Sequence, residues 1–181
     1  EYDEAIKRNG EYFAHYLNRG QARQQLGNKA GAQSDLEQAN RLLPTAAAHF
    51  ALGSLAQGAS NPARAIEHYK LAAGSDSEVG RRAGSALVRL DLPRNPAAYV
   101  QVGPVADKAG NLALRITNRA PAALRKLRVA AVAPGFAREY ASSATLMPGQ
   151  LVLVGTGVKL GELGNAASRL RGELRGAEVA E

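Results

Sequence analysis

The spacing of apolar residues changes once along the chain, near residue 91. Before that point apolar positions recur every three or four residues, which is the one-sided pattern of an amphipathic helix. In the segment 33–43 these positions are Leu36, Ala39, Leu42 and Leu43, and in the segment 63–73 they are Ala65, Ile66, Tyr69, Ala72 and Ala73. Glycine and proline interrupt the pattern, and Asn61 followed by Pro62 is typical of a helix start. The first half is therefore predicted to be a series of short helices.

After the proline-containing segment 92–96, apolar and polar residues alternate with a period of two, as in half-buried β-strands. The alternation is clearest at 112–117, 127–131 and 169–174. Turn residues between these segments predict about six or seven strands, and their short spacing favours an antiparallel sandwich over a parallel sheet. The predicted fold class is α+β with two domains, a helical one at 1–91 and an antiparallel β-sandwich at 97–181.

The helical half contains an internal repeat with a period of 33 residues. Gly53 follows Gly20 at this distance, and Ala65 follows Ala32 at the same distance. Two helices pack closely where one presents a small residue and the other inserts a larger side chain. We therefore expect these four residues to lie between paired helices, and the repeat to be one helical hairpin.

This repeat resembles the tetratricopeptide repeat (TPR). The resemblance is carried in the first unit by Tyr16, Leu17, Asn18, Arg19, Gly20, Leu26, Gly27, Ala32, Leu36, Ala39 and Pro44, and in the second by Leu52, Gly53, Ala65, Ile66, Tyr69 and Ala72. Ser60 and Ser77 depart from the pattern, because the family has glycine and proline there. The resemblance implies a stack of α-hairpins over 11–75, with a further helix at 78–90 as its cap.

In TPR proteins the first helices of successive hairpins line a groove that holds a partner segment. The resemblance places these residues on such a groove: Leu17, Asn18, Gln21, Gln24, Gln25, Phe50, Ser54 and Gln57. The lining is rich in amides, with Leu17 and Phe50 as apolar anchors, and lacks paired Lys and Arg for a terminal carboxylate. We expect a protein or peptide partner; packing against another domain is the alternative interpretation.

The β half resembles small immunoglobulin-like modules of bacterial envelope proteins, through Ile116-Thr117-Asn118 and Met147-Pro148-Gly149-Gln150. Helical repeats followed by such a module also resemble the C-terminal region of some bacterial periplasmic zinc metallopeptidases. This second resemblance implies a non-catalytic, substrate-presenting region, with the catalytic domain upstream of Glu1. It also implies a periplasmic or cell-envelope location, while a cytoplasmic one stays open.

Residue composition narrows the chemistry that the chain can perform. It contains no cysteine, which excludes disulfides, thiol catalysis and cysteine-ligated zinc. The three histidines, His15, His49 and His68, lie on different predicted helices without acidic residues at metal-ligand spacing, and no HExxH or GxSxG motif occurs. We therefore expect no catalytic residue, no metal site and no cofactor, and interpret the chain as non-enzymatic.

The net charge of +7 supports one further alternative, a surface for nucleic acid or anionic lipid. Such a surface would be formed by Arg125, Lys126, Arg128, Arg169, Arg171 and Arg175. The basic residues form no continuous run and are not interleaved with aromatic residues, so nucleic acid is the less favoured partner. No apolar run reaches the roughly 20 residues that a transmembrane helix needs. The sequence thus predicts an interaction module that binds a protein or peptide.

Overall fold

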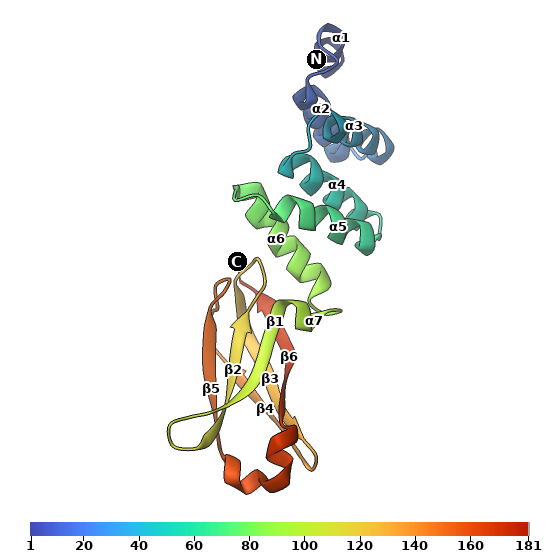
Figure 1. The fold of residues 1–181 in the computed structure, drawn as a ribbon. Helices are drawn as coiled ribbons and strands as arrows, with labels where there is room; N and C mark the ends of the chain where they lie inside the picture. The colour runs from blue at the N-terminus through green and yellow to red at the C-terminus, as the bar shows by residue number, and fades with distance from the viewer. Residues whose placement is uncertain (181) are drawn as a thin grey trace. The chain divides into compact units, whose positions relative to one another are not determined.

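The computed structural model describes residues 1–180 and divides into two compact units, with the boundary between Leu90 and Asp91 (Figure 1). The first unit is helical, and the second contains six antiparallel strands in two sheets. The predicted α+β class is therefore confirmed. No helix within residues 1–180 combines the length and the apolar character needed to cross a membrane.

The helical unit is built from antiparallel hairpins. Its helices are α1 (Tyr2–Arg8), α2 (Phe13–Gln25), α3 (Lys29–Leu42), α4 (Ala46–Gly58), α5 (Pro62–Ala73) and α6 (Glu78–Asp91). Short turns join α2 to α3 and α4 to α5, and the helices of each pair pack against each other along their length. The 33-residue period of the sequence thus corresponds to one hairpin.

Side-chain caps fix where these helices begin. The side chain of Asn28 accepts a hydrogen bond from the backbone N–H of Gly31, and that of Asn61 accepts one from Arg64. Thr45 caps α4 in the same way. Each cap satisfies a backbone donor at the helix start and contributes about 1 kcal/mol. The predicted start of a helix at Asn61 and Pro62 is confirmed.

The small residues of the repeat lie where the helices touch. A Cβ atom on Gly20 would lie 2.9 Å from Cγ of Leu36, and one on Gly53 would lie 2.7 Å from the ring of Tyr69. Ala32 and Ala65 are fully buried. The prediction that these four residues face inward is confirmed, and each hairpin inserts one large side chain of its second helix against a glycine of its first.

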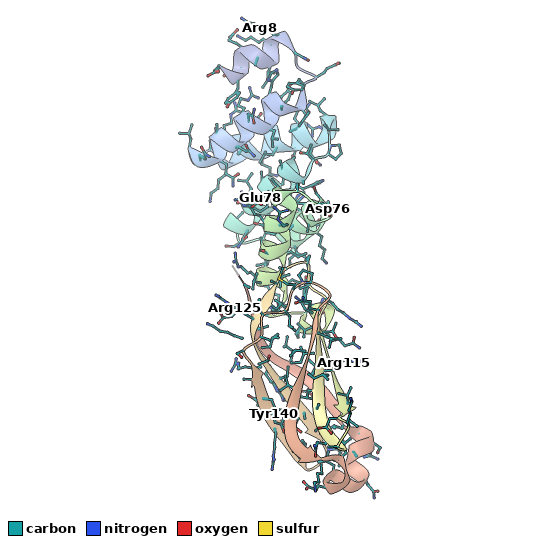
Figure 2. All side chains as sticks on the ribbon, turned by 90° about the vertical axis from the view of Figure 1, so that its left-hand side faces the viewer. Arg8, Asp76, Glu78, Arg115, Arg125 and Tyr140 are labelled. Carbon is teal, nitrogen blue, oxygen red and sulfur yellow. The ribbon has the colours of Figure 1, made fainter. Side chains whose placement is uncertain are left out.

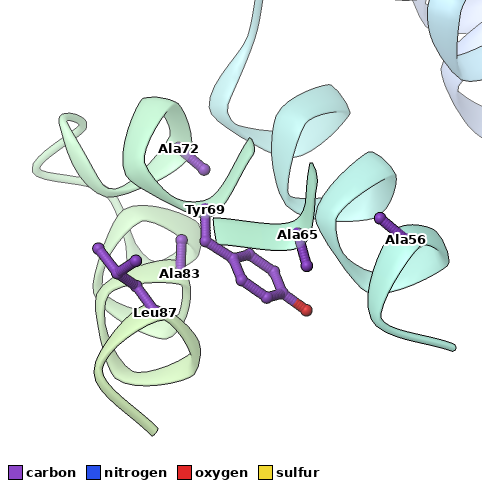
Figure 3. Close-up of a cluster of buried hydrophobic side chains, with 6 residues drawn as sticks. All are labelled: Ala56, Ala65, Tyr69, Ala72, Ala83 and Leu87. Atoms are coloured by element: carbon purple, nitrogen blue, oxygen red, sulfur yellow. The ribbon is translucent and has the colours of Figure 1, made fainter. Parts of the chain in front are cut away.

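The last hairpin shares a core cluster with α6. Figure 3 shows its buried side chains, which are Ala56, Ala65, Tyr69, Ala72, Ala83 and Leu87. On α6 the predicted apolar face was Val79, Ala83, Ala86, Leu87 and Leu90. Ala83 and Leu87 are buried in the cluster, and Ala86 and Leu90 pack against it. Gly80, Gly84 and Val88 are buried as well. The predicted face of α6 therefore lies against the last hairpin, and the buried side of the helix is wider than predicted.

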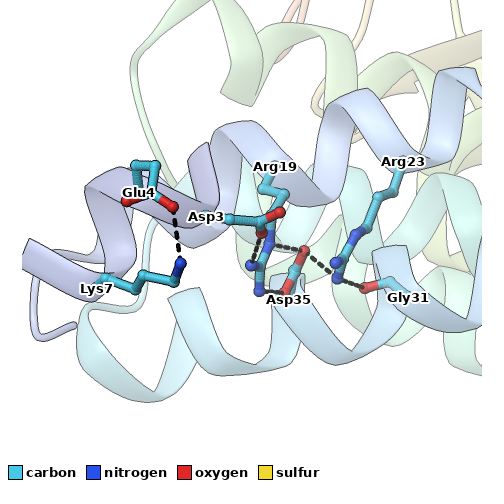
Figure 4. Close-up of polar contacts among 7 residues, drawn as sticks. All are labelled: Asp3, Glu4, Lys7, Arg19, Arg23, Gly31 and Asp35. Carbon is cyan, nitrogen blue, oxygen red and sulfur yellow. Dashed lines mark hydrogen bonds and ion pairs between the residues drawn. The ribbon is translucent and has the colours of Figure 1, made fainter. Parts of the chain in front are cut away.

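A network of ion pairs joins the first three helices. Asp35 is almost fully buried in α3 and accepts hydrogen bonds from Nε and Nη2 of Arg19, at 2.8 and 2.6 Å (Figure 4). Arg23 also donates to Asp35, and Arg19 reaches Asp3 of α1. Because the buried carboxylate is paired twice, α2 and α3 are held in one register.

The strand unit is a pair of three-stranded antiparallel sheets, as the sequence predicts for a sandwich. Its elements are α7 (Pro96–Tyr99), β1 (Val100–Ala106), β2 (Asn111–Asn118), β3 (Leu124–Ala133), β4 (Phe136–Ser142), β5 (Leu151–Lys159), a 3₁₀ segment η1 (Leu160–Arg169) and β6 (Arg171–Val179). One sheet has the order β1-β2-β5 and the other β4-β3-β6. The 3₁₀ segment between β5 and β6 was not predicted.

The core of the strand unit follows the predicted alternation. Leu112, Leu114 and Ile116 of β2 are fully buried, as are Leu127 and Val129 of β3. The two sheets also approach closely along one side, because a Cβ atom on Gly172 would lie 2.5 Å from a methyl group of Val102. Glycine at this position therefore lets β1 and β6 pack together.

Candidate functional site

The eight predicted groove residues lie on two neighbouring helices, and we refer to them together as the α2–α4 face. Leu17, Asn18, Gln21, Gln24 and Gln25 come from α2, and Phe50, Ser54 and Gln57 come from α4. The two groups meet where Nε2 of Gln24 donates a hydrogen bond to Oγ of Ser54, at 3.2 Å. The structure thus brings together residues that lie about one repeat apart in the sequence.

The two expected apolar anchors are largely occupied by the core. Leu17 is half-buried and packs against the cluster of Leu36, Ala51 and Leu52. Phe50 is half-buried as well, and its ring centroid lies 5.7 Å from that of Tyr69. Both side chains stabilise the hairpins, so the apolar surface they leave for a partner is smaller than the sequence suggested.

Gln57 is held by the same hairpin. The hydroxyl of Tyr69 donates a hydrogen bond of 2.8 Å to Oε1 of Gln57. Burial raises the pKa of Tyr69, so this hydroxyl stays protonated and remains a donor at neutral pH. The bond orients the amide of Gln57 and leaves its NH₂ group as a donor that a partner can use.

Three amide side chains of the α2–α4 face make no side-chain hydrogen bond within residues 1–180. Asn18 and Gln25 are exposed, and Gln21 is half-buried. Each amide has one acceptor and two donors, which matches the C=O and N–H groups of a peptide backbone. This part of the face can therefore pair with an extended segment without first breaking a bond inside the protein.

The structure adds one residue to the face that sequence reasoning missed. The guanidinium carbon of Arg82 in α6 lies 5.0 Å from the ring centroid of Phe50. The sequence did contain a signal for Arg82, because the helical repeat continues into 78–90. That segment was interpreted only as a capping helix. Because α6 packs on the last hairpin, Arg82 is the charged neighbour of the α2–α4 face.

A pair of histidines was also missed. Nδ1 of His49 in α4 and Nδ1 of His68 in α5 lie 3.2 Å apart, at hydrogen-bond distance. Burial lowers the pKa of both imidazoles, and the charge of His49 lowers that of His68 further. Within residues 1–180, no group of three or more His, Asp or Glu side chains is arranged to hold a metal ion.

The basic residues proposed as an alternative surface are shared between the second sheet and η1. Arg125, Lys126, Arg128, Arg171 and Arg175 lie on β3 and β6, while Arg169 ends η1. Glu178 pairs with Arg125 and Lys126, Glu173 pairs with Arg171 and Arg175, and Arg175 also reaches Glu139. These glutamates offset much of the positive charge.

Other basic residues lie elsewhere in the strand unit. Figure 2 labels Arg115 as well as Arg125, and Arg115 lies on β2, in the sheet that does not contain β3. The positive charge is thus spread over both sheets. Most of it lies on the sheet β4-β3-β6, where the glutamates pair with several of the basic side chains.

No family model matches the chain, and the curated proteins likewise contain no match to it. Within the helical unit, the α2–α4 face combines predicted partner-binding positions with amide groups that are free to bind.

Proposed function

We propose that the helical unit binds a protein or peptide segment on the α2–α4 face, as the resemblance to TPR proteins implies. The observation that carries the proposal is the set of three unpaired amides, Asn18, Gln21 and Gln25, on one helix of the face. Their donors and acceptors match an extended backbone. The hydrogen bond between Gln24 and Ser54 supports the proposal further, because it joins the polar side chains of α2 to those of α4.

Selection from a random decapeptide library tests this proposal on the full chain. Enriched peptides are then titrated against a variant in which Asn18, Gln21 and Gln25 are all alanine. Alanine keeps the helix propensity high, so the fold is retained while the amides are removed. Since one hydrogen bond contributes about 0.5–1.5 kcal/mol, the triple variant is expected to bind at least about tenfold more weakly.

The matched control replaces Gln33 and Gln38 of α3 by alanine. These amides lie on the second helix of the same hairpin and pair with Glu37 and Arg41. Peptide affinity is expected to stay within about twofold in this control. A library that yields no binding peptide, or peptides that bind the triple variant as tightly as the unchanged protein, would contradict the proposal.

A further inference from the structure

The buried positions of α4 recur on α6 after 32 residues. In α4 they include Ala48, Ala51, Leu52 and Ala56, and in α6 they include Gly80, Ala83, Gly84 and Val88. The two helices therefore turn the same positions toward the core. With this offset Arg82 is equivalent to Phe50, and Arg89 is equivalent to Gln57. The α2–α4 face thus continues onto α6, where it becomes basic.

The contact between Arg82 and Phe50 supports this placement. The guanidinium carbon lies 5.0 Å from the ring centroid, so the equivalent positions of α4 and α6 are spatial neighbours. A guanidinium that stacks on an aromatic ring keeps the N–H groups of its edge free for a carboxylate. Arg82 is exposed, so a partner can reach that edge.

Neither Arg82 nor Arg89 forms an ion pair or side-chain hydrogen bond within residues 1–180. Other arginines of the helical unit do: Arg19 and Arg23 pair with Asp35, Arg64 pairs with Glu37, and Arg81 pairs with Glu78. Arg82 and Arg89 are seven residues apart, which is close to two helical turns, or about 10.5 Å along the axis. They therefore share one side of α6.

We propose that the segment bound by the α2–α4 face is acidic, with carboxylates that pair with Arg82 and Arg89. This inference rests on the proposed function and names the chemistry of its partner. Arginine binds a carboxylate through two parallel N–H···O bonds, which are stronger than neutral hydrogen bonds. Amides on α2 and α4 bind the backbone of the segment, and the arginines on α6 select its charge.

The peptide selection described above tests the inference when it is repeated with two variants. One carries Arg82→Gln and Arg89→Gln. The control carries Arg81→Gln, which removes a neighbouring positive charge that is already paired with Glu78. All three side chains are exposed, so the fold is expected to persist, and thermal unfolding of each variant checks this.

The unchanged protein and the Arg81 control are expected to enrich peptides containing Asp and Glu, and the double variant is expected to lose this enrichment. Acidic peptides selected by the unchanged protein should bind the double variant at least about tenfold more weakly, because two charge-assisted hydrogen-bonded pairs are lost. Their affinity for the control should change by less than about twofold.

Other outcomes separate this inference from the proposed function. Enriched peptides that depend on Asn18, Gln21 and Gln25 but carry no excess of acidic residues would leave the proposed function in place and overturn the inference. Equal losses in the double variant and the Arg81 control would overturn it too, since only overall charge would then matter. Displacement of the acidic peptides by a single-stranded oligonucleotide at equal charge concentration would also overturn the inference, because the arginines would then bind any polyanion.

Discussion

His49 and His68 show how residues acquire shared chemistry from their neighbours. They are separated by 19 positions in the sequence, yet their Nδ1 atoms lie 3.2 Å apart. Glu67 raises the pKa of both rings, and Glu37 raises that of His68, whereas Arg64 lowers that of His68. Burial outweighs the acidic residues, so both imidazoles favour the neutral form in the folded chain.

This arrangement predicts that acid destabilises the helical unit. Because folding lowers the pKa of both rings below the ordinary value of 6.5, the unfolded chain binds more protons between that value and the folded-state pKa. The contribution is fully present above pH 6.5 and is lost as pH falls through the folded-state pKa. Thermal unfolding followed by circular dichroism at a series of pH values measures the effect.

A variant with His49→Gln and His68→Gln is expected to lose much of this pH dependence, while His15→Gln in α2 should keep it. A double variant whose unfolding temperature falls with acid as steeply as that of the unchanged chain would refute the role of the pair.

At the scale of elements, the turns of the two hairpins differ at the position where the backbone has a positive φ. Gly27 and Ser60 occupy equivalent places after α2 and α4, and both have a positive φ, at 79° and 56°. Glycine adopts this conformation freely, whereas a side chain with a Cβ atom is strained there. The departure from the repeat noticed in the sequence is therefore a strained turn in the structure.

Replacing Ser60 with glycine is expected to stabilise the helical unit by about 0.5–1 kcal/mol, because relief of strain exceeds the added entropy of the unfolded chain. Urea unfolding followed at the helical signal measures the change. The reverse substitution, Gly27→Ser, should lower the free energy of unfolding by a similar amount. An unchanged or lower midpoint for Ser60→Gly would show that the turn stores no strain.

At the scale of the whole molecule, each unit has its own buried core, and Asn118 is central to that of the strand unit. Its Nδ2 donates to the carbonyl oxygens of Ala122 and Leu146, and its Oδ1 accepts from the backbone N–H of Ala120. The side chain is fully buried. It therefore holds three backbone groups of the loops around β2 in place through buried hydrogen bonds.

Asn118→Ala is expected to destabilise the strand unit by about 3 kcal/mol, since three buried hydrogen bonds are lost. Hydrogen exchange of the full chain, resolved by segment, measures where protection is lost. Amides of β2, β3 and β5 should exchange faster, while those of α2 to α5 should keep their rates because the helical core is separate. Equal losses in both units would show that the two cores unfold together.

The candidate face was only partly predictable. The resemblance to TPR proteins identified Asn18, Gln21 and Gln25 as groove residues, and the helical period places these three residues on one side of α2. The spacing could not show that Phe50 packs on Tyr69, nor that Gln57 is bound by the hydroxyl of Tyr69. Those contacts depend on how α5 lies against α4.

Local patterns along the chain were sufficient for the helices, the strands and the inward positions of Gly20, Ala32, Gly53 and Ala65, because period and residue size act between near neighbours. Only the tertiary structure decided which residue of α6 lies next to the candidate face. α6 packs on the last hairpin through the cluster that contains Tyr69, Ala72, Ala83 and Leu87, and this packing places Arg82 over Phe50. The charge next to the candidate face is therefore a property of packing between distant segments, which no single stretch of sequence contains.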